Sequence, residues 1–370
     1  MGRADKADSR GSAVPPLISQ LRPEISVETA ALLEEASAAL ARFDASVGTV
    51  TAPFLSILLR TESAASSEIE QLTASAKQIS LAELGVSRSA NAKLIVGNVR
   101  AMRSAVELSE NLSEAAMIAM HEALLGESQP ELTGGYRAQQ VWIGGGGISP
   151  HQASFVPPHH ENVEPLMADL VRFMQRQDLP VLAQVAISHA QFETIHPFPD
   201  GNGRAGRALI HALLRAAGLT RNVTVPVSAG LLKNTAGYFA ALTAYREGNL
   251  EPILRAFADA AFIAISNGEA LVAELLRLRE SWSERVAARK GSGAARLQEV
   301  LLGQPVVSVK IAQEALKISQ PAASNAIVAL ENAGVLRQTS AARRNRFWEA
   351  PEVLDALEEF AARARRGGGL

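Results

Sequence analysis

The sequence predicts a mainly α-helical protein, and three observations lead to that fold class. Apolar residues recur at helical spacing along most of the chain, as at Leu33, Ala36 and Leu40. Aromatic residues make up only 5% of the 370 residues, while alanine is abundant, which suits closely packed helices. Strand-like residues are confined to short stretches, of which the most distinct lie at residues 136–143 and 335–350.

The helical pattern begins after a charged, small-residue N-terminus, residues 1–15, which we expect to be disordered. Short non-helical breaks are expected at residues 81–85 and 223–227, and another near Asn267-Gly268 inside the last long helix. The predicted helices cover residues 26–44, a segment from 53 onward, 93–107, 113–125, 163–176, 179–195, 204–218, 231–246 and 251–289.

Residues 136–158 carry the pattern of a β-hairpin. The strand-like run 136–143 is followed by four consecutive glycines, Gly144–Gly147, and then by Ala153-Ser-Phe-Val-Pro-Pro158. Two extended runs joined by a flexible tip predict a hairpin, with a loose surface loop as the alternative.

A separate C-terminal unit is predicted after the linker-like Lys290-Gly-Ser-Gly-Ala. Two short helices, residues 309–316 and 321–333, precede strand-like residues 335–338 and 346–350, a pattern that predicts a winged helix-turn-helix over 295–362. Gln320, Ser324 and Asn325 are expected to face outward, and Arg343, Arg344 and Arg346 crowd the wing, which motivates a DNA-binding hypothesis. Because the second helix carries little positive charge, protein docking or homodimer formation is the alternative.

Composition and charge limit the kinds of partner. The net charge of −2 gives no overall attraction to nucleic acid or membranes, so such binding would need a local patch. The chain has no cysteine, which excludes disulfides and thiolate metal sites and is compatible with a reducing compartment. The most apolar run, 253–265, contains Arg255 and Asp259, and the N-terminus lacks the apolar core of a signal peptide. We therefore expect a cytoplasmic protein without a membrane segment.

The stretch His196-Pro-Phe-Pro-Asp-Gly-Asn-Gly-Arg-Ala-Gly-Arg207 concentrates groups that suit phosphate chemistry. Gly201 and Gly203 permit a tight turn that opens directly into a helix, whose N-terminus favours an anion. Arg204 and Arg207 lie three residues apart on its first turn, so both can face the same polyphosphate.

Two further groups define what this phosphate site can do. His196 is the side chain of the stretch that can act as a base near neutral pH, and Asp200 is a hard oxygen ligand suited to Mg²⁺ between phosphates. Together they predict transfer of a phosphorus group from a nucleotide to a hydroxyl, without specifying which phosphorus is attacked. His121 and His189 lie on apolar helix faces and are expected in the core. A His189–His196 metal pair is disfavoured, because the chain has no HExxH.

The stretch matches the pattern HPFxxGNGRxGR in full and resembles the core motif of the Fic family. The run YRAQQVWIGG followed by FVPP is similar to the family's flap, and the helix with Tyr238 is similar to its YYxxL helix, with Phe239 at the second tyrosine. Ser66-Ser67-Glu68-Ile69-Glu70 is similar to the family's inhibitory pattern [ST]xxxE[GN], except that Gln71 stands where Gly or Asn is usual. The resemblance extends over about residues 26–289.

The resemblance implies a Fic-type helical core at residues 111–289 with a hairpin flap, preceded at 16–110 by a helical region that contains an inhibitory helix. It also implies an adenylyltransferase that moves AMP from ATP to a Ser, Thr or Tyr hydroxyl of a target protein, or of itself. In that scheme His196 takes the hydroxyl proton and Asp200 binds Mg²⁺.

The nucleotide-binding residues follow from the same resemblance. Asn202, Gly203 and Arg204 would hold the α- and β-phosphates, and Arg207 would hold the γ-phosphate. The remaining positions implied are Gly201, Ala205 and Gly206 in the motif, Ile143 and Gly144 in the flap, and Tyr238 against the adenine, although a core aromatic is an equal interpretation of Tyr238.

Regulation is implied as well. Glu70, with Ser66 in the same helix, would pair with Arg207 and displace the γ-phosphate. Two alternatives remain open: a DNA-binding transcriptional regulator with a nucleotide-sensing Fic domain, and an enzyme that removes AMP instead of adding it.

Overall fold

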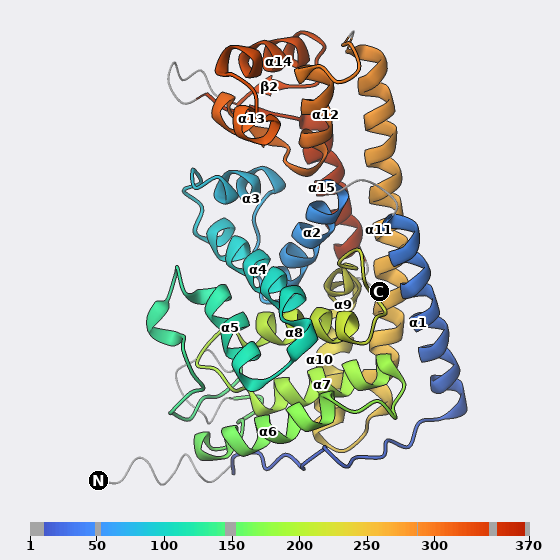
Figure 1. The fold of residues 1–370 in the computed structure, drawn as a ribbon. Helices are drawn as coiled ribbons and strands as arrows, with labels where there is room; N and C mark the ends of the chain where they lie inside the picture. The colour runs from blue at the N-terminus through green and yellow to red at the C-terminus, as the bar shows by residue number, and fades with distance from the viewer. Residues whose placement is uncertain (1–10, 49–52, 145–152, 287, 340–345, 367–370) are drawn as a thin grey trace. The chain divides into compact units, whose positions relative to one another are not determined.

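The computed structural model describes residues 11–48, 53–144, 153–286, 288–339 and 346–366. Within them it contains fifteen α-helices and one small three-stranded sheet (Figure 1), so the mainly α fold class is confirmed. Two compact units are formed, one from residues 1–39, 97–220 and 234–260, and the other from residues 40–96, 221–233 and 261–370.

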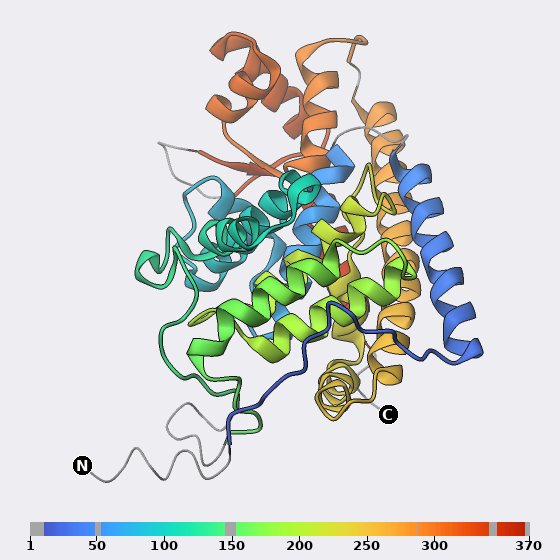
Figure 2. The same ribbon diagram turned by 60° about the horizontal axis from the view of Figure 1, so that its bottom comes forward.

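The first unit is built around α7 (Val181–Ile195), in which every residue from Leu182 to Ile195 is buried. A helix buried all round has no solvent-facing side, so its polar residues, such as Gln184 and His189, must find partners inside the protein. Figure 2 shows α6 and α7 lying alongside each other, and α8 and α10 also pack on α7. The unit's other helices surround this centre: α5 (Glu114–Leu125), α6 (Val163–Met174), α8 (Asn202–Ala216), α10 (Thr235–Arg246), and parts of α1 (Val27–Gly48), α4 (Ala90–Glu107) and α11 (Glu251–Arg285).

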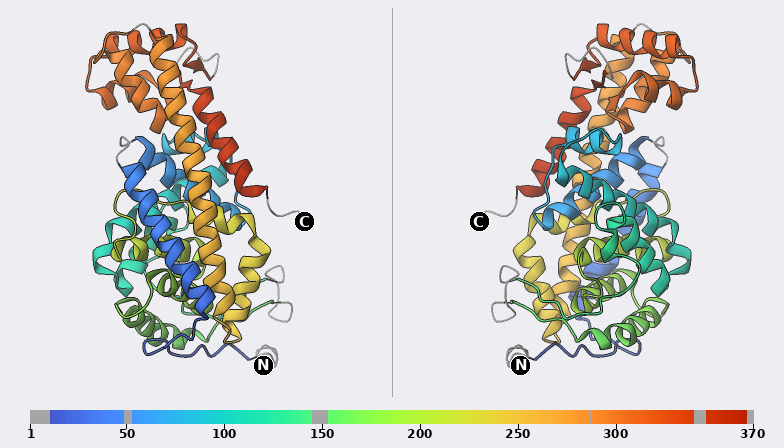
Figure 3. Two further views of the ribbon diagram at one scale, coloured as in Figure 1. Left: turned by 90° about the vertical axis from the view of Figure 1, so that its right-hand side faces the viewer. Right: turned by 90° about the vertical axis from the view of Figure 1, so that its left-hand side faces the viewer.

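The second unit joins the C-terminal elements to α2 and α3. α2 packs against α9, α12 and α15, while α3 contacts α15 and β1. Figure 3 shows α12–α14 and the sheet in orange and red, with α15 as the final red helix. The elements are α2 (Pro53–Ile69), α3 (Ala76–Glu83), α9 (Val227–Lys233), α12 (Gly293–Gly303), β1 (Val306–Val307), α13 (Val309–Leu316), α14 (Gln320–Asn332), β2 (Arg337–Gln338), β3 (Trp348–Glu349) and α15 (Pro351–Arg365).

The sheet of the second unit has the strand order β1-β3-β2 and is antiparallel, with Glu349 opposite both Val306 and Arg337. The winged helix-turn-helix stays a prediction. Of the basic tip expected to touch DNA, Arg343 and Arg344 lie outside the described residues, and Arg346 lies over the Trp348 ring, 5.3 Å from its centroid.

Three expectations about the helices are wrong. α11 continues through Asn267-Gly268 without a break, because a β-carbon on Gly268 would lie 2.9 Å from the Phe43 ring, so glycine there serves close packing. Residues 231–246 form two helices instead of one, divided at Asn234, whose side chain caps α10 by accepting from the Gly237 N–H. The break expected at residues 81–85 is also wrong in part, because α3 continues to Glu83.

The flap, which we define as residues 136–158, is not a regular hairpin in its described part. A single antiparallel bridge joins Ile143 to Phe155. Within residues 136–142, the side chains of Arg137 and Gln140 instead donate to carbonyls outside a strand ladder. Near this segment the Ala13 N–H donates to the Val156 carbonyl at 3.0 Å, so residues 11–15 are placed although the expected disorder covered 1–15.

By length and composition alone, α11 is long and apolar enough to cross a membrane, whereas the sequence led us to expect no such segment. Half of its most apolar window is buried inside the protein, and core helices of soluble proteins pass the same test.

Candidate functional site

The site begins where α7 ends. His196 follows the helix with φ +52°, and its N–H still donates to the Phe192 carbonyl at 2.8 Å. A left-handed conformation is uncommon for a residue other than glycine and is held only where the surroundings enforce it. His196 is thereby presented at the point where the chain leaves the rigid central helix.

The loop that follows is locked by its own side chains. Asn202 accepts from the Phe198 N–H and donates to the Phe198 carbonyl, both at 2.8 Å. His121 on α5 bonds the Asp200 carbonyl through Nε2 at 2.9 Å and stacks on the Phe198 ring at 3.9 Å. His121 is in the core, as expected, but it also fixes this loop, which the sequence did not indicate.

Asn202 therefore cannot serve a ligand in the way a free amide would. Its side chain is 2% exposed, and both of its polar atoms are used on Phe198. What it can offer a phosphate is its backbone N–H at the start of α8.

The N-terminus of α8 provides the predicted anion site. Gly201 caps the helix with φ +72°, and a β-carbon there would lie 2.9 Å from Leu124. The first helical hydrogen bond runs from the Ala205 N–H to the Gly201 carbonyl, so the N–H groups before it lie at the open end of the helix. Arg204 and Arg207 are 4% and 2% exposed, so their charges are held in a low-dielectric setting, where attraction to an anion is strong.

Gly206 lets α8 lie close against α7. A β-carbon on it would be 2.7 Å from Glu193 Oε1 and 3.0 Å from Phe192 Cδ1. The Gly206 carbonyl accepts from His189 Nδ1 at 3.0 Å, and His189 Nε2 in turn accepts from the Tyr238 hydroxyl at 2.7 Å. His189 is fully buried and Tyr238 is 2% exposed, an arrangement that favours the core-aromatic interpretation of Tyr238.

Asp200 suits a magnesium ion shared with phosphates. Its carboxylate is about half exposed; Oδ1 accepts from the Gly201 N–H at 2.7 Å, and Oδ2 lies 3.9 Å from Arg204. Mg²⁺ is commonly bound by one or two carboxylates together with substrate phosphates, so a single accessible carboxylate at the anion site fits it.

His196 is kept neutral by its surroundings. Burial lowers the pKa of His196 to about 3, and the charges of Arg137 and Arg246 act in the same direction. A neutral imidazole can accept a proton, which is the state that a general base requires before reaction.

Arg137 ties the flap to the His196 loop, and sequence reasoning missed this role. Its guanidinium donates to the carbonyls of Gln139 and His196 at 2.9 Å and of Pro158 at 2.5 Å, and its backbone N–H donates to the Pro197 carbonyl. Burial lowers the pKa of Arg137 to about 10. The only sequence signal was its place in the flap motif.

The flap is secured at two further points. Gln140 donates to the Pro157 carbonyl at 2.8 Å, and Arg246 on α10 covers the Phe155 ring at 3.8 Å from its centroid. Of the flap residues expected to bind nucleotide, Ile143 forms the bridge to Phe155, and Gly144 has φ +81° with no room for a β-carbon beside Ser154.

The predicted inhibitory segment lies at the end of α2 in the second unit. Its Ser66 is fully buried. Gln71 adopts φ +64°, its N–H donates to the Glu68 carbonyl, and the Leu72 N–H donates to the Ser67 carbonyl, so the helix ends in a Schellman motif. Gln71 thus terminates the helix in the conformation that glycine would adopt, and Glu70 is the residue at which the turn begins. The pairing of Glu70 with Arg207 stays a prediction.

These features define a class: a helical protein in which a neutral histidine adjoins an anion site built on one helix N-terminus, beneath an anchored flap. Residues 111–214 match the model of the Fic/DOC family, and residues 30–107 match that of the Fic/DOC family N-terminal region. These two matches place residues 30–107 and 111–214 in the Fic/DOC family.

Named relatives share part of the chain. Protein adenylyltransferase Fic of Nematostella vectensis is 30% identical over 153 residues, which are 40% of this chain and 32% of that protein. Probable protein adenylyltransferase aq_aa38 of Aquifex aeolicus is 31% identical over 208 residues, 53% of this chain and 57% of that protein. The chain thus matches less than two thirds of the length of these relatives.

Solved structures support the fold over a longer range. A Fic family protein from Desulfovibrio desulfuricans G20 aligns with a TM-score of 0.56 and 23% identity over 90% of this chain and 98% of that one. Fic-1 of C. elegans aligns with a TM-score of 0.50 and 20% identity over 66% of this chain and 73% of that one. At these identities the similarity concerns the fold alone.

Proposed function

We propose that the protein is an adenylyltransferase that moves AMP from ATP to a Ser, Thr or Tyr hydroxyl of a target protein. The observation that carries this proposal is the position of His196, left-handed at the end of α7 and followed directly by the loop that opens into α8. A base and an anion site are thereby joined by a short, locked segment. The relatives named adenylyltransferases support the choice of AMP as the group transferred.

The chemical step needs one proton acceptor and one stabilised leaving group. The hydroxyl oxygen attacks the α-phosphorus of ATP, the bond from that phosphorus to the pyrophosphate oxygen breaks, and His196 takes the hydroxyl proton. The open N–H groups of α8 and the buried charge of Arg204 stabilise the negative charge that gathers on the phosphates.

Asp200 would hold Mg²⁺ against the phosphates, and the ion would supply neutralisation of the polyphosphate charge. The Asp200 carboxylate is oriented for this by the Gly201 N–H, and the backbone of Asp200 is held by His121. An Asp200→Asn variant should require more Mg²⁺ for half-maximal activity than the wild type.

The flap would bind the target. An extended segment of the target could pair with the backbone near Ile143, as in β-strand addition, so that its side chains matter less than its main chain. Arg137 and Gln140, which hold the flap carbonyls, keep this edge in place beside His196.

Restraint by Glu70 is the regulatory part of the proposal. A carboxylate can replace a phosphate on the fork of an arginine such as Arg207. The end of α2 is supported within its unit: Glu68 pairs with Arg365 of α15, and the Ala76 N–H donates to Glu358. The C-terminal helix thus holds the segment that carries Glu70.

The test is self-labelling with α-labelled ATP and Mg²⁺. We expect weak labelling of the wild type, strong labelling of Glu70→Gly and none of His196→Ala. Equal labelling of the wild type and Glu70→Gly would remove the inhibitory role, and persistent labelling of His196→Ala would remove the base. Release of AMP from a pre-labelled target by the wild type, abolished in Glu70→Gly, would instead indicate an enzyme that removes the modification.

A second candidate function, that of a DNA-binding regulator, rests on the C-terminal elements. Gln320 and Asn325 are exposed on α14, and Arg346 is exposed beside the segment expected as a wing. A mobility-shift assay with Arg343, Arg344 and Arg346 changed to alanine tests it. Binding that weakens and loses part of its salt dependence would support DNA contact, while unchanged or absent binding would favour a protein-docking or dimerising role.

A further inference from the structure

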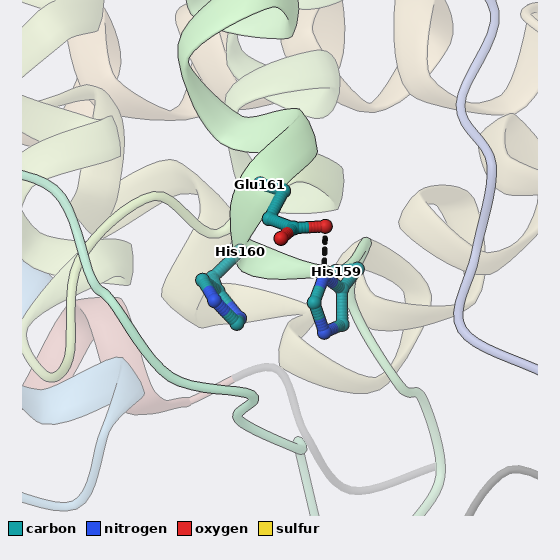
Figure 4. A group of neighbouring side chains, drawn as sticks. All are labelled: His159, His160 and Glu161. Atoms are coloured by element: carbon teal, nitrogen blue, oxygen red, sulfur yellow. Dashed lines mark ion pairs between the residues drawn. The ribbon is translucent and has the colours of Figure 1, made fainter.

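Two histidines and a glutamate stand in a row where the flap leads into α6, and the function proposed above uses none of them. His159, His160 and Glu161 follow Pro158 directly, and residues 160–162 form one 3-10 turn before α6. Figure 4 shows the carboxylate of Glu161 directed at the His159 ring, with the His160 ring on the near side of the same turn.

The ligand atoms of these three side chains converge. His159 Nδ1 lies 3.4 Å from Glu161 Oε2, the two imidazole centroids are 4.1 Å apart, and one potential ligand atom from each residue lies within 4.8 Å of the others. Four ligands placed tetrahedrally about 2.1 Å from a zinc ion are themselves about 3.4 Å apart. The His159–Glu161 pair already has that spacing, and a ligand atom of His160 lies within 4.8 Å of both.

An ion pair alone does not account for this arrangement. It uses His159 and Glu161, whose side chains are 47% and 79% exposed, and such exposed pairs contribute little to stability. It leaves His160 unexplained: that side chain is half-buried, and its Nδ1 is buried without a hydrogen-bond partner among the described residues. A buried imidazole nitrogen normally has a hydrogen-bond partner or a metal.

The backbone on both sides of the cluster is already ordered. The preceding carbonyls, of Pro157 and Pro158, accept from Gln140 and Arg137, and the Asn162 N–H donates to the His159 carbonyl at 2.9 Å. Little backbone freedom would therefore be lost when a ligand binds, which favours binding.

We propose that His159, His160 and Glu161 form a zinc-binding site. Two imidazole nitrogens and one carboxylate oxygen are a borderline donor set that suits Zn²⁺ and does not suit Mg²⁺ or Ca²⁺, which prefer oxygen ligands throughout. Because His159 and Glu161 are exposed, the fourth position is open to water or to a side chain of a bound partner.

The site is chemically separate from Asp200 and shares no residue with the stretch from His196 to Arg207. A metal held here would join the C-terminal end of the flap to the start of α6. It would not take part in the transfer step.

The experiment is zinc titration of the full-length chain, freed of any affinity tag and stripped with a chelator, followed by calorimetry. Cobalt substitution gives a second readout, because tetrahedral Co²⁺ absorbs strongly in the visible range and octahedral Co²⁺ does not. The variants are His159→Ala, His160→Ala and Glu161→Gln. Glu164→Gln is the matched control, since Glu164 is an exposed carboxylate of the same segment outside the cluster.

We expect one zinc ion per chain, and each of the three variants to weaken binding by about tenfold or more, while Glu164→Gln leaves it unchanged. Cobalt should give the tetrahedral spectrum in the wild type and lose it in both histidine variants. Absence of stoichiometric binding, or binding that survives both histidine substitutions, would overturn the site. Zinc affinity that is unchanged in Glu161→Gln would overturn the three-ligand assignment. Self-labelling activity is not used as a readout, so the result is independent of the proposed transferase function.

Discussion

Replacing Arg137 by methionine should release the flap from the loop that carries His196. Methionine keeps the aliphatic length of arginine but donates no hydrogen bond, so the carbonyls of Gln139, Pro158 and His196 lose their partner. Arg137 is 3% exposed, and water cannot readily take its place. The variant therefore tests whether this one side chain organises the site.

The expected magnitude follows from the three bonds of 2.9 Å or less. At about 1 kcal/mol net for each, the loss is about 3 kcal/mol of stability, a large part of what a domain possesses. The Arg137 charge also helps to lower the pKa of His196, so its removal should raise that pKa. Arg137→Lys keeps the charge but not the planar fork, so it should lose stability without the same change at His196.

Urea unfolding and the pH profile of self-labelling measure the two effects separately. Arg137→Met should lower the unfolding midpoint and move the acid limb of the profile to higher pH, whereas Arg137→Lys should only lower the midpoint. Arg172→Met is the control, because Arg172 is exposed on α6 and its partner Asp169, 3.3 Å away, also accepts from the N–H groups of Ile18 and Ser19. If Arg137→Met unfolds like the control, or both Arg137 variants shift the acid limb equally, the reasoning is refuted.

Three further predictions concern burial, backbone conformation and packing. Burial lowers the pKa of His189 to about 3, so the unfolded chain binds a proton that the folded one excludes. The free energy of unfolding should therefore fall as pH drops below about 6.5, by about 1.4 kcal/mol per pH unit. Urea unfolding between pH 7.5 and 5.5 should show a weaker dependence on pH in His189→Gln than in the wild type. Gln71→Gly should raise stability by about 1 kcal/mol by relieving φ +64°, and a midpoint equal to that of Gln71→Ala would contradict this. Gly206→Ala should cost about 1–3 kcal/mol through overlap with Glu193, while Gly135→Ala, with open space around it, should unfold like the wild type.

The sequence predicted the local structure best in the stretch from His196 to Arg207, where the same residues also suggested the chemistry. The order histidine, two prolines, aspartate, glycines and arginines predicted a turn that opens into a helix, and α8 does begin at Asn202 after a left-handed Gly201. The same approach failed at residues 136–143, where strand-like residues suggested a ladder. Arg137 and Gln140 instead donate to the carbonyls of Pro158 and Pro157. The residues of 136–143 alone do not reveal those partners.

By itself the sequence predicted the mainly helical fold and most of the helices, and it supplied the proposal for the reacting groups, because periodicity and short spacing are properties of neighbouring residues. Only the tertiary structure decided how each buried polar group is used. Asn202 turns inward to Phe198, His121 holds Asp200 from a different helix, and Arg137 reaches His196 across 59 positions of the chain. Such hydrogen bonds depend on which distant segments the fold brings into contact. Each buried polar group then bonds to whichever partner the packing places beside it.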